Sequence, residues 1–357
     1  METQLKEQAQ TQAQAQEQVK VQGQAQELAQ TQTQANDYVS VSRLTKKYGD
    51  VTAVDSLSFT VRRGEIFGFL GPNGAGKTTT LNVISTLADF DHGEVRVAGY
   101  DIVKDEFKIK ALLGVVPQEI ALYQNLTAAE NVALFASLYG LRGAALKKAV
   151  ADALEFVGLT DDRKKLAKKM SGGMQRRLNI ACGIAHKPEL IIMDEPTVGV
   201  DARSRDQILG SIKTLRDEGA TIIYTSHYMP EVQKIADRIA IIDKGRLAAI
   251  GTEHELLEHV TDRKTVVIGI GGRDVPDIET VVSDVRMLAG VKRARYDAER
   301  DEIRLDVDLT ASTISPVLRT IMDRNVAIRE VSEDEISLET TFLALTGTDL
   351  HAHNSAS

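Results

Sequence analysis

The sequence predicts a core of the α/β class, with a mixed sheet and an inserted helical subdomain, followed by a small ferredoxin-like α+β domain. Its 357 residues correspond to two domains at about 150 residues each. Because strand patterns alternate with helical patterns, we expect a largely parallel sheet in the core. Continuous apolar runs, typical of strands buried on both faces, occupy Leu190–Met193, Thr221–Thr225 and Ile239–Ile242.

The first half of the core begins with short β-rich segments and continues with helices. Three strands are predicted, the last of which runs into a glycine-rich turn, at Val39–Leu44, Leu57–Val61 and Ile66–Leu70. The spacing of apolar residues predicts helices at Thr78–Thr86, Glu130–Tyr139 and Leu146–Val157. The predominantly helical stretch from about 121 to 180 is the predicted inserted subdomain.

A second, separate alternation of strands and helices begins after about residue 263. Its order is β-α-β-β-α-β, which is typical of a ferredoxin-like domain. The predicted elements are strand Thr265–Ile270, helix Asp277–Leu288, strands Val291–Tyr296 and Glu302–Asp308, helix Thr313–Asp323, strand Val326–Val331 and a last helix from Ser337.

These patterns divide the chain into four predicted segments. Residues 1–36 contain 13 glutamines with almost nothing to bury, so we expect a disordered tail. The core domain is predicted at 37–262, the accessory domain at 263–348 and a polar tail at 349–357.

The composition excludes several classes of protein. The net charge is -8, and residues 265–357 alone carry 10 basic and 17 acidic side chains, so we expect no nucleic-acid partner. The single cysteine, Cys182, excludes a disulfide framework, and we expect it to be a small buried residue. The chain contains no apolar run long enough to span a membrane and no secretory signal at its start. A soluble intracellular protein is therefore expected.

A glycine-rich loop between a predicted strand and a predicted helix matches the pattern G-x-x-x-x-G-K-[ST]. Such a loop turns backbone N–H groups toward phosphate oxygens at the positive end of the helix. Lys77 can reach the β- and γ-phosphates of a nucleoside triphosphate, and the Thr78 hydroxyl suits Mg²⁺. The predicted phosphate-binding residues are Gly71, Pro72, Asn73, Gly74, Ala75, Gly76, Lys77, Thr78 and Thr79.

Two adjacent carboxylates follow the apolar strand at 190–193. Asp194 stands at the carboxyl end of that strand, where a magnesium ion beside the phosphates would lie. Glu195 is the candidate general base for an attacking water. The pair predicts hydrolysis of the bound nucleotide.

Between the loop and this acidic pair lies Met170-Ser171-Gly172-Gly173-Met174-Gln175-Arg176-Arg177, which resembles the signature motif of ATP-binding-cassette (ABC) ATPases. Met170 stands where the family usually has Leu or Tyr, and Met174 where Gln is common. The resemblance extends to four more motifs in the expected order. Tyr48 resembles the A-loop residue that stacks on adenine, Gln118 the Q-loop glutamine, Asp201 the D-loop aspartate and His227 the switch histidine.

The resemblance implies how these residues act. ATP and Mg²⁺ are the implied cofactors, with Thr78, Gln118 and Asp194 as metal ligands. Glu195, His227 and Gln118 are the implied catalytic residues. Ser171, Gly172 and Gly173 open a helix whose N–H groups suit an anion. They are implied to clamp the γ-phosphate bound by a second copy, in a two-fold dimer around two ATP molecules.

Three longer segments resemble one subgroup, the bacterial type-2 (daunorubicin-resistance-like) exporter ATPases: residues 195–201, 224–229 and 337–347. This subgroup implies an ATP-hydrolysing motor that drives a separate membrane permease, peripheral on the cytoplasmic face of the membrane, and often exports a drug or antibiotic. The alternative is a soluble ABC-type ATPase without a permease, either regulatory or associated with nucleic acid. A simple P-loop kinase would have no use for the signature motif.

Overall fold

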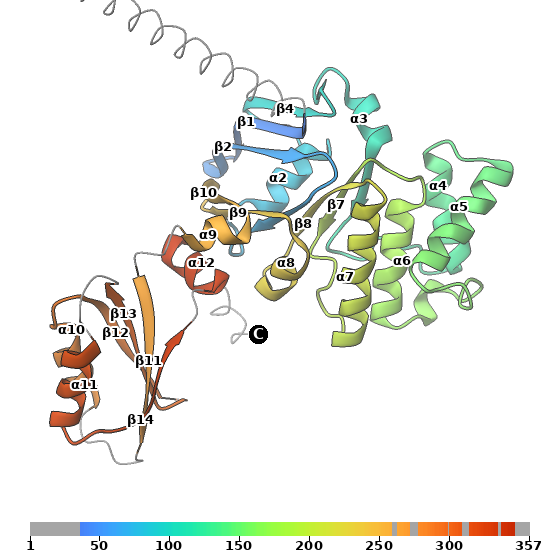
Figure 1. The fold of residues 1–357 in the computed structure, drawn as a ribbon. Helices are drawn as coiled ribbons and strands as arrows, with labels where there is room; N and C mark the ends of the chain where they lie inside the picture. The colour runs from blue at the N-terminus through green and yellow to red at the C-terminus, as the bar shows by residue number, and fades with distance from the viewer. Residues whose placement is uncertain are drawn as a thin grey trace, which may run out of the picture. The chain divides into compact units, whose positions relative to one another are not determined.

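The computed structural model describes residues 36–258, 263–271, 278–298, 300–308, 314–334 and 337–346 (Figure 1). The predicted tails, except Asn36, lie outside these residues. Two compact units are present. One contains the described residues up to Phe67, 76–225 and 244–246, and the other contains 68–75, 226–243 and those from Leu247 onward.

An antiparallel sheet opens the chain, in the order β2-β1-β4-β5. In strand β1 the apolar residues Val39, Val41 and Leu44 are in the core, and Tyr38 is buried as well. β1 pairs with both β2 and β4. The bounds are β1 (Asp37–Tyr48), β2 (Val51–Arg62), β4 (His92–Val97) and β5 (Tyr100–Asp101).

A six-stranded sheet has the order β10-β9-β3-β8-β7-β6. Strands β3, β7 and β8 are buried along their whole length, as their apolar runs predict, and β6, β7 and β8 pair in parallel. The strands are β3 (Ile66–Leu70), β6 (Leu113–Val116), β7 (Leu190–Asp194), β8 (Thr221–Thr225), β9 (Arg238–Asp243) and β10 (Arg246–Gly251).

The predicted helical subdomain is present as α4 (Ala128–Leu138), α5 (Gly143–Phe156), the short 3₁₀ helix η1 (Ala167–Lys169) and α6 (Gly172–Ile184). Figure 1 shows α4, α5 and α6 side by side. A capping box starts α4, in which the Thr127 hydroxyl accepts from the Glu130 N–H and the Glu130 carboxylate accepts from the Thr127 N–H. Outside this subdomain, the other described helices before β8 are α2 (Lys77–Ile84), α3 (Glu106–Leu112) and α7 (Ala202–Asp217).

The C-terminal region has the predicted ferredoxin-like topology. Its antiparallel sheet has the order β12-β13-β11-β14, so β13 lies between the two strands that α10 connects. Helices α10 and α11 cover one face of this sheet, where Val285 and Ile321 are fully buried (Figure 1). The elements are β11 (Arg263–Gly271), α10 (Ile278–Arg286), β12 (Val291–Asp297), β13 (Glu302–Asp308), α11 (Ile314–Asp323) and β14 (Ala327–Asp334).

The last helix, α12 (Leu338–Thr346), returns to pack against α8 (Met229–Ile235), α9 (Glu253–Glu258) and β9. Its buried residues include Leu338 and Phe342. Within the described residues, no helix combines the length and the apolar character that a bilayer span requires.

Candidate nucleotide-binding site

The glycine-rich loop follows β3 and has a backbone that other residues cannot adopt. A Cβ atom on Gly71 would lie 2.6 Å from the carbonyl oxygen of Ile242. Gly76 has φ +98°, and a Cβ there would lie 2.5 Å from the carbonyl oxygen of Ala53. Gly74, with φ +80°, also adopts a left-handed conformation. The loop conformation therefore depends on the glycines that the motif contains.

The remaining residues of the motif form the tip of the loop and the start of α2. The Ala75 N–H donates to the carbonyl of Pro72 (3.1 Å), and Asn73 is exposed. Thr79 is half-buried in the first turn of the helix. The N-cap of α2 is Gly76, and no side-chain cap hydrogen bond is formed at this helix start.

Lys77, the first residue of α2, is only 6% exposed. Burial lowers the pKa of its ammonium group, while the negative charges of Glu195 and Asp194 act in the opposite direction. The structure thus brings the predicted phosphate-binding lysine to the predicted acidic pair.

Asp194, the last residue of β7, accepts a hydrogen bond on each carboxylate oxygen. The Thr78 hydroxyl donates to Oδ2 (3.0 Å), and the Thr225 hydroxyl, at the end of β8, donates to Oδ1 (2.6 Å). A carboxylate and a hydroxyl are hard oxygen donors, and they suit Mg²⁺ held jointly by protein, water and phosphate oxygens. Thr78 and Asp194 therefore fit a magnesium ion whose other ligands come from water and phosphate oxygens.

Glu195 has a strained backbone, with φ +46°. Its N–H donates to the hydroxyl (3.0 Å) and to the carbonyl (3.2 Å) of Thr225. The Gln118 amide donates to Oε2 of Glu195 (3.2 Å). The predicted base and the predicted Q-loop glutamine are therefore in direct contact, although 77 positions separate them in the chain.

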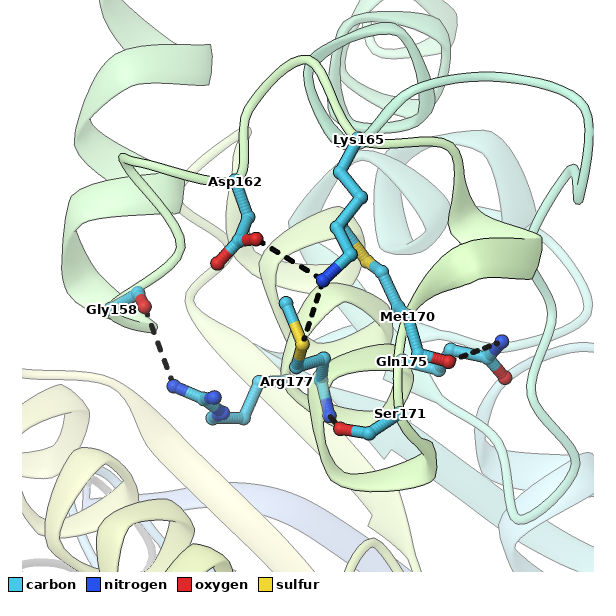
Figure 2. Close-up of polar contacts among 8 residues, drawn as sticks. Gly158, Asp162, Lys165, Met170, Ser171, Gln175 and Arg177 are labelled. Atoms are coloured by element: carbon cyan, nitrogen blue, oxygen red, sulfur yellow. Dashed lines mark hydrogen bonds and ion pairs between the residues drawn. The ribbon is translucent and has the colours of Figure 1, made fainter.

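The signature motif begins helix α6 (Figure 2). Ser171 is the N-cap, and its hydroxyl accepts from the Met174 N–H (3.3 Å). Met170, which stands where the family usually has Leu or Tyr, is buried. The Lys165 ammonium lies 3.4 Å from an Asp162 oxygen and 3.8 Å from the sulfur of Met174, which ties the preceding loop to the helix start.

The second glycine of the motif touches the predicted D-loop. A Cβ on Gly173 would lie 2.9 Å from the Ser204 hydroxyl and 3.6 Å from a carboxylate oxygen of Asp201. Asp201 is the N-cap of α7 and accepts from the Ser204 N–H (3.0 Å). A Cβ on Gly172 meets nothing within 4 Å. The structure therefore joins the signature motif and Asp201 in one cluster.

Gly173→Ala is expected to lower the ATP hydrolysis rate by about tenfold or more, because the new methyl group displaces α6 from Ser204. The affinity of the chain for ATP should change by less than about twofold, because the phosphate loop is untouched. Hydrolysis assays and titration with a fluorescent ATP analogue measure the two quantities. Gly210→Ala is the matched control, since a Cβ there meets nothing within 4 Å, and equal effects of the two variants would contradict the expectation.

Tyr48 and His227 lie at the ends of strands. Tyr48 closes β1 and is 52% exposed, and the Lys46 ammonium lies 5.1 Å from its ring centre. His227 follows β8 within a tight turn in which the Ser226 hydroxyl accepts from the Tyr228 N–H (2.9 Å).

Three polar residues of this region are absent from the sequence-based site. Thr225 holds both Asp194 and the backbone of Glu195. Arg176 and Asn179, on α6, are buried and contact the backbone beside Gln118. Arg176 and Asn179 could have been found from the sequence, because these two polar residues lie on the same face of α6 as Cys182. Cys182 is buried, as predicted.

Comparison with known proteins gives the family of this chain. Residues 54–198 match the family model described as ABC transporter. The chain is 42% identical over 316 residues to the linearmycin resistance ATP-binding protein LnrL of Bacillus subtilis, an alignment that covers 87% of this chain and 99% of the relative. The chain belongs to the ABC transporter ATP-binding family.

Other relatives of this ABC ATPase are also named as drug-resistance ATP-binding proteins. The daunorubicin resistance ATP-binding protein DrrA3 of Streptomyces coeruleorubidus is 36% identical over 89% of this chain and 98% of its own length. The doxorubicin resistance ATP-binding protein DrrA of Mycobacterium tuberculosis is 34% identical over 86% of this chain and 93% of its own length. The ABC ATPase therefore falls in the predicted group of type-2 exporter ATPases, as an ATP-hydrolysing motor subunit.

Solved structures agree with the cassette fold. An ATP-binding subunit of an ABC transporter has a TM-score of 0.58 and 27% identity, and covers 63% of this chain and 93% of its own. The dimeric, post-hydrolysis cassette MJ0796 with ADP and Pi has a TM-score of 0.55 and 26% identity, over 60% of this chain and 98% of its own.

Proposed function

We propose that this ABC ATPase works as a homodimer on the cytoplasmic face of the cell membrane and drives a separate type-2 permease that exports a drug or antibiotic. The near full-length similarity to drug-resistance ATP-binding proteins carries this proposal. It extends over 316 residues, well beyond the 54–198 cassette match, and so reaches the C-terminal region. Residues 37–262 would form the nucleotide-binding domain and 263–348 the accessory domain, between tails at 1–36 and 349–357.

The cluster around Lys77 is proposed to bind the triphosphate. Lys77 would neutralise the β- and γ-phosphates, aided by the N-terminus of α2. Thr78, Asp194 and Gln118 would hold Mg²⁺, whose charge stabilises the phosphate oxygens as negative charge develops on them. Tyr48 would stack on the adenine.

Glu195 is proposed to be the base for hydrolysis. Its carboxylate would take a proton from water as the water oxygen bonds to the γ-phosphorus, while the bond from that phosphorus to the bridging oxygen of ADP breaks. Thr225 and Gln118 fix the position of Glu195, since one holds its backbone and the other its carboxylate. His227 would hold the γ-phosphate and help to orient the water.

The cluster of Ser171, Gly172, Gly173 and Asp201 is proposed to complete the ATP site of a second copy. Helix α6 offers its N-terminal N–H groups, and Gly172 leaves space for an anion to approach them. In a two-fold dimer each copy would supply one such terminus, so both sites would close together.

An apolar groove beside the Q-loop is proposed to receive a cytoplasmic helix of the permease. The cavity has a volume of about 590 Å³ and its wall is mainly apolar. Two of its side chains are well exposed, Leu87 at 68% and Leu138 at 73%. Its lining includes Leu87, Leu113, Val115, Phe135, Leu138 and Tyr139.

Purification of the tagged chain from membranes tests this proposal, and a copurified multispanning protein is the expected result. Leu138→Asp, in the groove, should lower its recovery by about tenfold, whereas Val103→Asp should not, since Val103 is equally exposed and lies outside the groove. Coexpression of that partner with the chain should raise resistance to linearmycin or daunorubicin in a sensitive host. Recovery of no membrane partner would favour an ATPase that works without a permease.

A further inference from the structure

We infer that Arg176 is a positioning residue that couples the signature end of α6 to the hydrolytic residues through the backbone of the Q-loop. This inference rests on the proposed dimer, in which Ser171 faces the ATP of the second copy. It adds a connection from that contact to Glu195 of the same chain.

Arg176 lies in the second turn of α6 and is 7% exposed. Its guanidinium group donates to the carbonyl oxygen of Gln118 and, at 3.5 Å, to that of Pro117. The charge of Glu195 also acts on this guanidinium group. A buried arginine that binds backbone carbonyls fixes the path of that backbone, because the planar group presents several donors in one rigid geometry.

Asn179, one turn further along α6, binds the same segment. Its amide oxygen accepts from the Ala121 N–H (3.3 Å), and its amide nitrogen donates to the Pro117 carbonyl (3.5 Å). Two buried side chains of one helix therefore hold the backbone from 117 to 121. The Gln118 side chain, which this backbone carries, donates to Glu195 (3.2 Å).

A continuous series of contacts thus runs from the capped start of α6 to Glu195. A shift of α6 when its N-terminus engages a phosphate moves the carbonyl oxygens that Arg176 holds, and with them the Gln118 amide. Glu195 has a strained backbone and is buried, so a small displacement of its partner alters its alignment with water. ATP in the second copy's site would in this way set the hydrolysis rate in the first.

The neighbouring arginine offers a matched control. Arg177 donates to the carbonyls of Val157 (2.9 Å) and Gly158 (3.4 Å) just after α5, and Figure 2 shows the contact with Gly158. It has the same chemistry on the same helix, and it also binds backbone carbonyls. Its loss should weaken packing of α5 against α6 without moving Gln118.

The test compares Arg176→Gln, Arg176→Lys and Arg177→Gln in the purified full chain, by hydrolysis rate against ATP concentration, ATP affinity and thermal unfolding. For Arg176→Gln we expect kcat to fall by about tenfold, ATP affinity to stay within about twofold and the Hill coefficient to fall toward about 1. Arg176→Lys should recover part of kcat, because it keeps a charged donor. Arg177→Gln should lose thermal stability but keep both kcat and the Hill coefficient.

Unchanged kcat and Hill coefficient in Arg176→Gln would overturn the inference, as would equal losses in Arg176→Gln and Arg177→Gln. If Arg176→Gln does not fold, Asn179→Ala takes its place, since it releases the same backbone and should lower kcat in the same way. A wild-type chain that does not hydrolyse ATP would overturn the proposed function itself. Hydrolysis that is normal in the wild type and in every variant would overturn only the role of Arg176.

Discussion

Glu195→Gln is expected to lower the rate of ATP hydrolysis by about 100-fold or more while ATP binding is retained. An amide cannot take the proton from the attacking water, but it has the same shape as the carboxylate. The substitution preserves the backbone contact of residue 195 with Thr225, and the one side-chain oxygen that it keeps can still accept a hydrogen bond from the Gln118 amide. Closed dimers with bound ATP should therefore accumulate, because their opening follows hydrolysis.

Size-exclusion chromatography with and without ATP, together with phosphate release, measures both effects. Glu119→Gln is the control, since Glu119 is exposed, beside Gln118 in the chain, and has no proposed role. Normal turnover in Glu195→Gln would remove Glu195 as the base.

Lys77→Ala is expected to weaken ATP binding by about 30-fold or more, and hydrolysis with it, because it removes a buried positive charge from the proposed phosphate site. The neighbouring Asp194 and Glu195 would then lie in the same site without that compensating charge. Titration with a fluorescent ATP analogue measures the affinity, and thermal unfolding checks that the variant folds.

The control for this variant is Lys148→Ala, which removes an exposed ammonium paired with Asp152 on α5. Its ATP affinity should equal that of the wild type. An ATP affinity of Lys77→Ala within twofold of the wild type would contradict the assignment of the phosphate site.

The sequence predicted the bounds of strands correctly where a short apolar run ends at turn residues. Strands β3, β8 and β13 have the predicted bounds, because their residues alternate or are buried throughout and polar or glycine residues flank them. The order of elements in the C-terminal region was also predictable. The order of the strands within the sheet, β12-β13-β11-β14, followed only from the expected ferredoxin-like fold. Strand pairing depends on contacts between segments that are distant in the chain.

Other elements gave too little signal to be predicted. Strand β4 has only two buried residues, at positions 95 and 97, and β6 is four residues long. Helix α7 is largely polar, and only Ile208, Leu209, Ile212 and Leu215 form its buried stripe. Such segments acquire their structure from their neighbours in the fold.

The site shows the same division. The phosphate loop and the acidic pair are local motifs, so the sequence predicts them directly, and the structure brings Lys77, Thr78, Gln118, Asp194 and Glu195 together. Thr225 and Arg176 were missed because they act through contacts 31 and 58 positions away in the chain. Both residues lie in segments that the sequence analysis singled out, but their partners become visible only in the fold.

Each ATP site is proposed to combine the phosphate loop of one copy with the signature motif of another. Lys77→Ala and Gly173→Ala should each hydrolyse ATP about tenfold or more slower than the wild type when alone, but a mixed dimer carries one intact site. An equal mixture of the two variants is therefore expected to recover up to about a quarter of the wild-type hydrolysis rate, because half of the dimers are mixed. A mixture as inactive as its components, under conditions where dimers form, would contradict an ATP site shared between two copies.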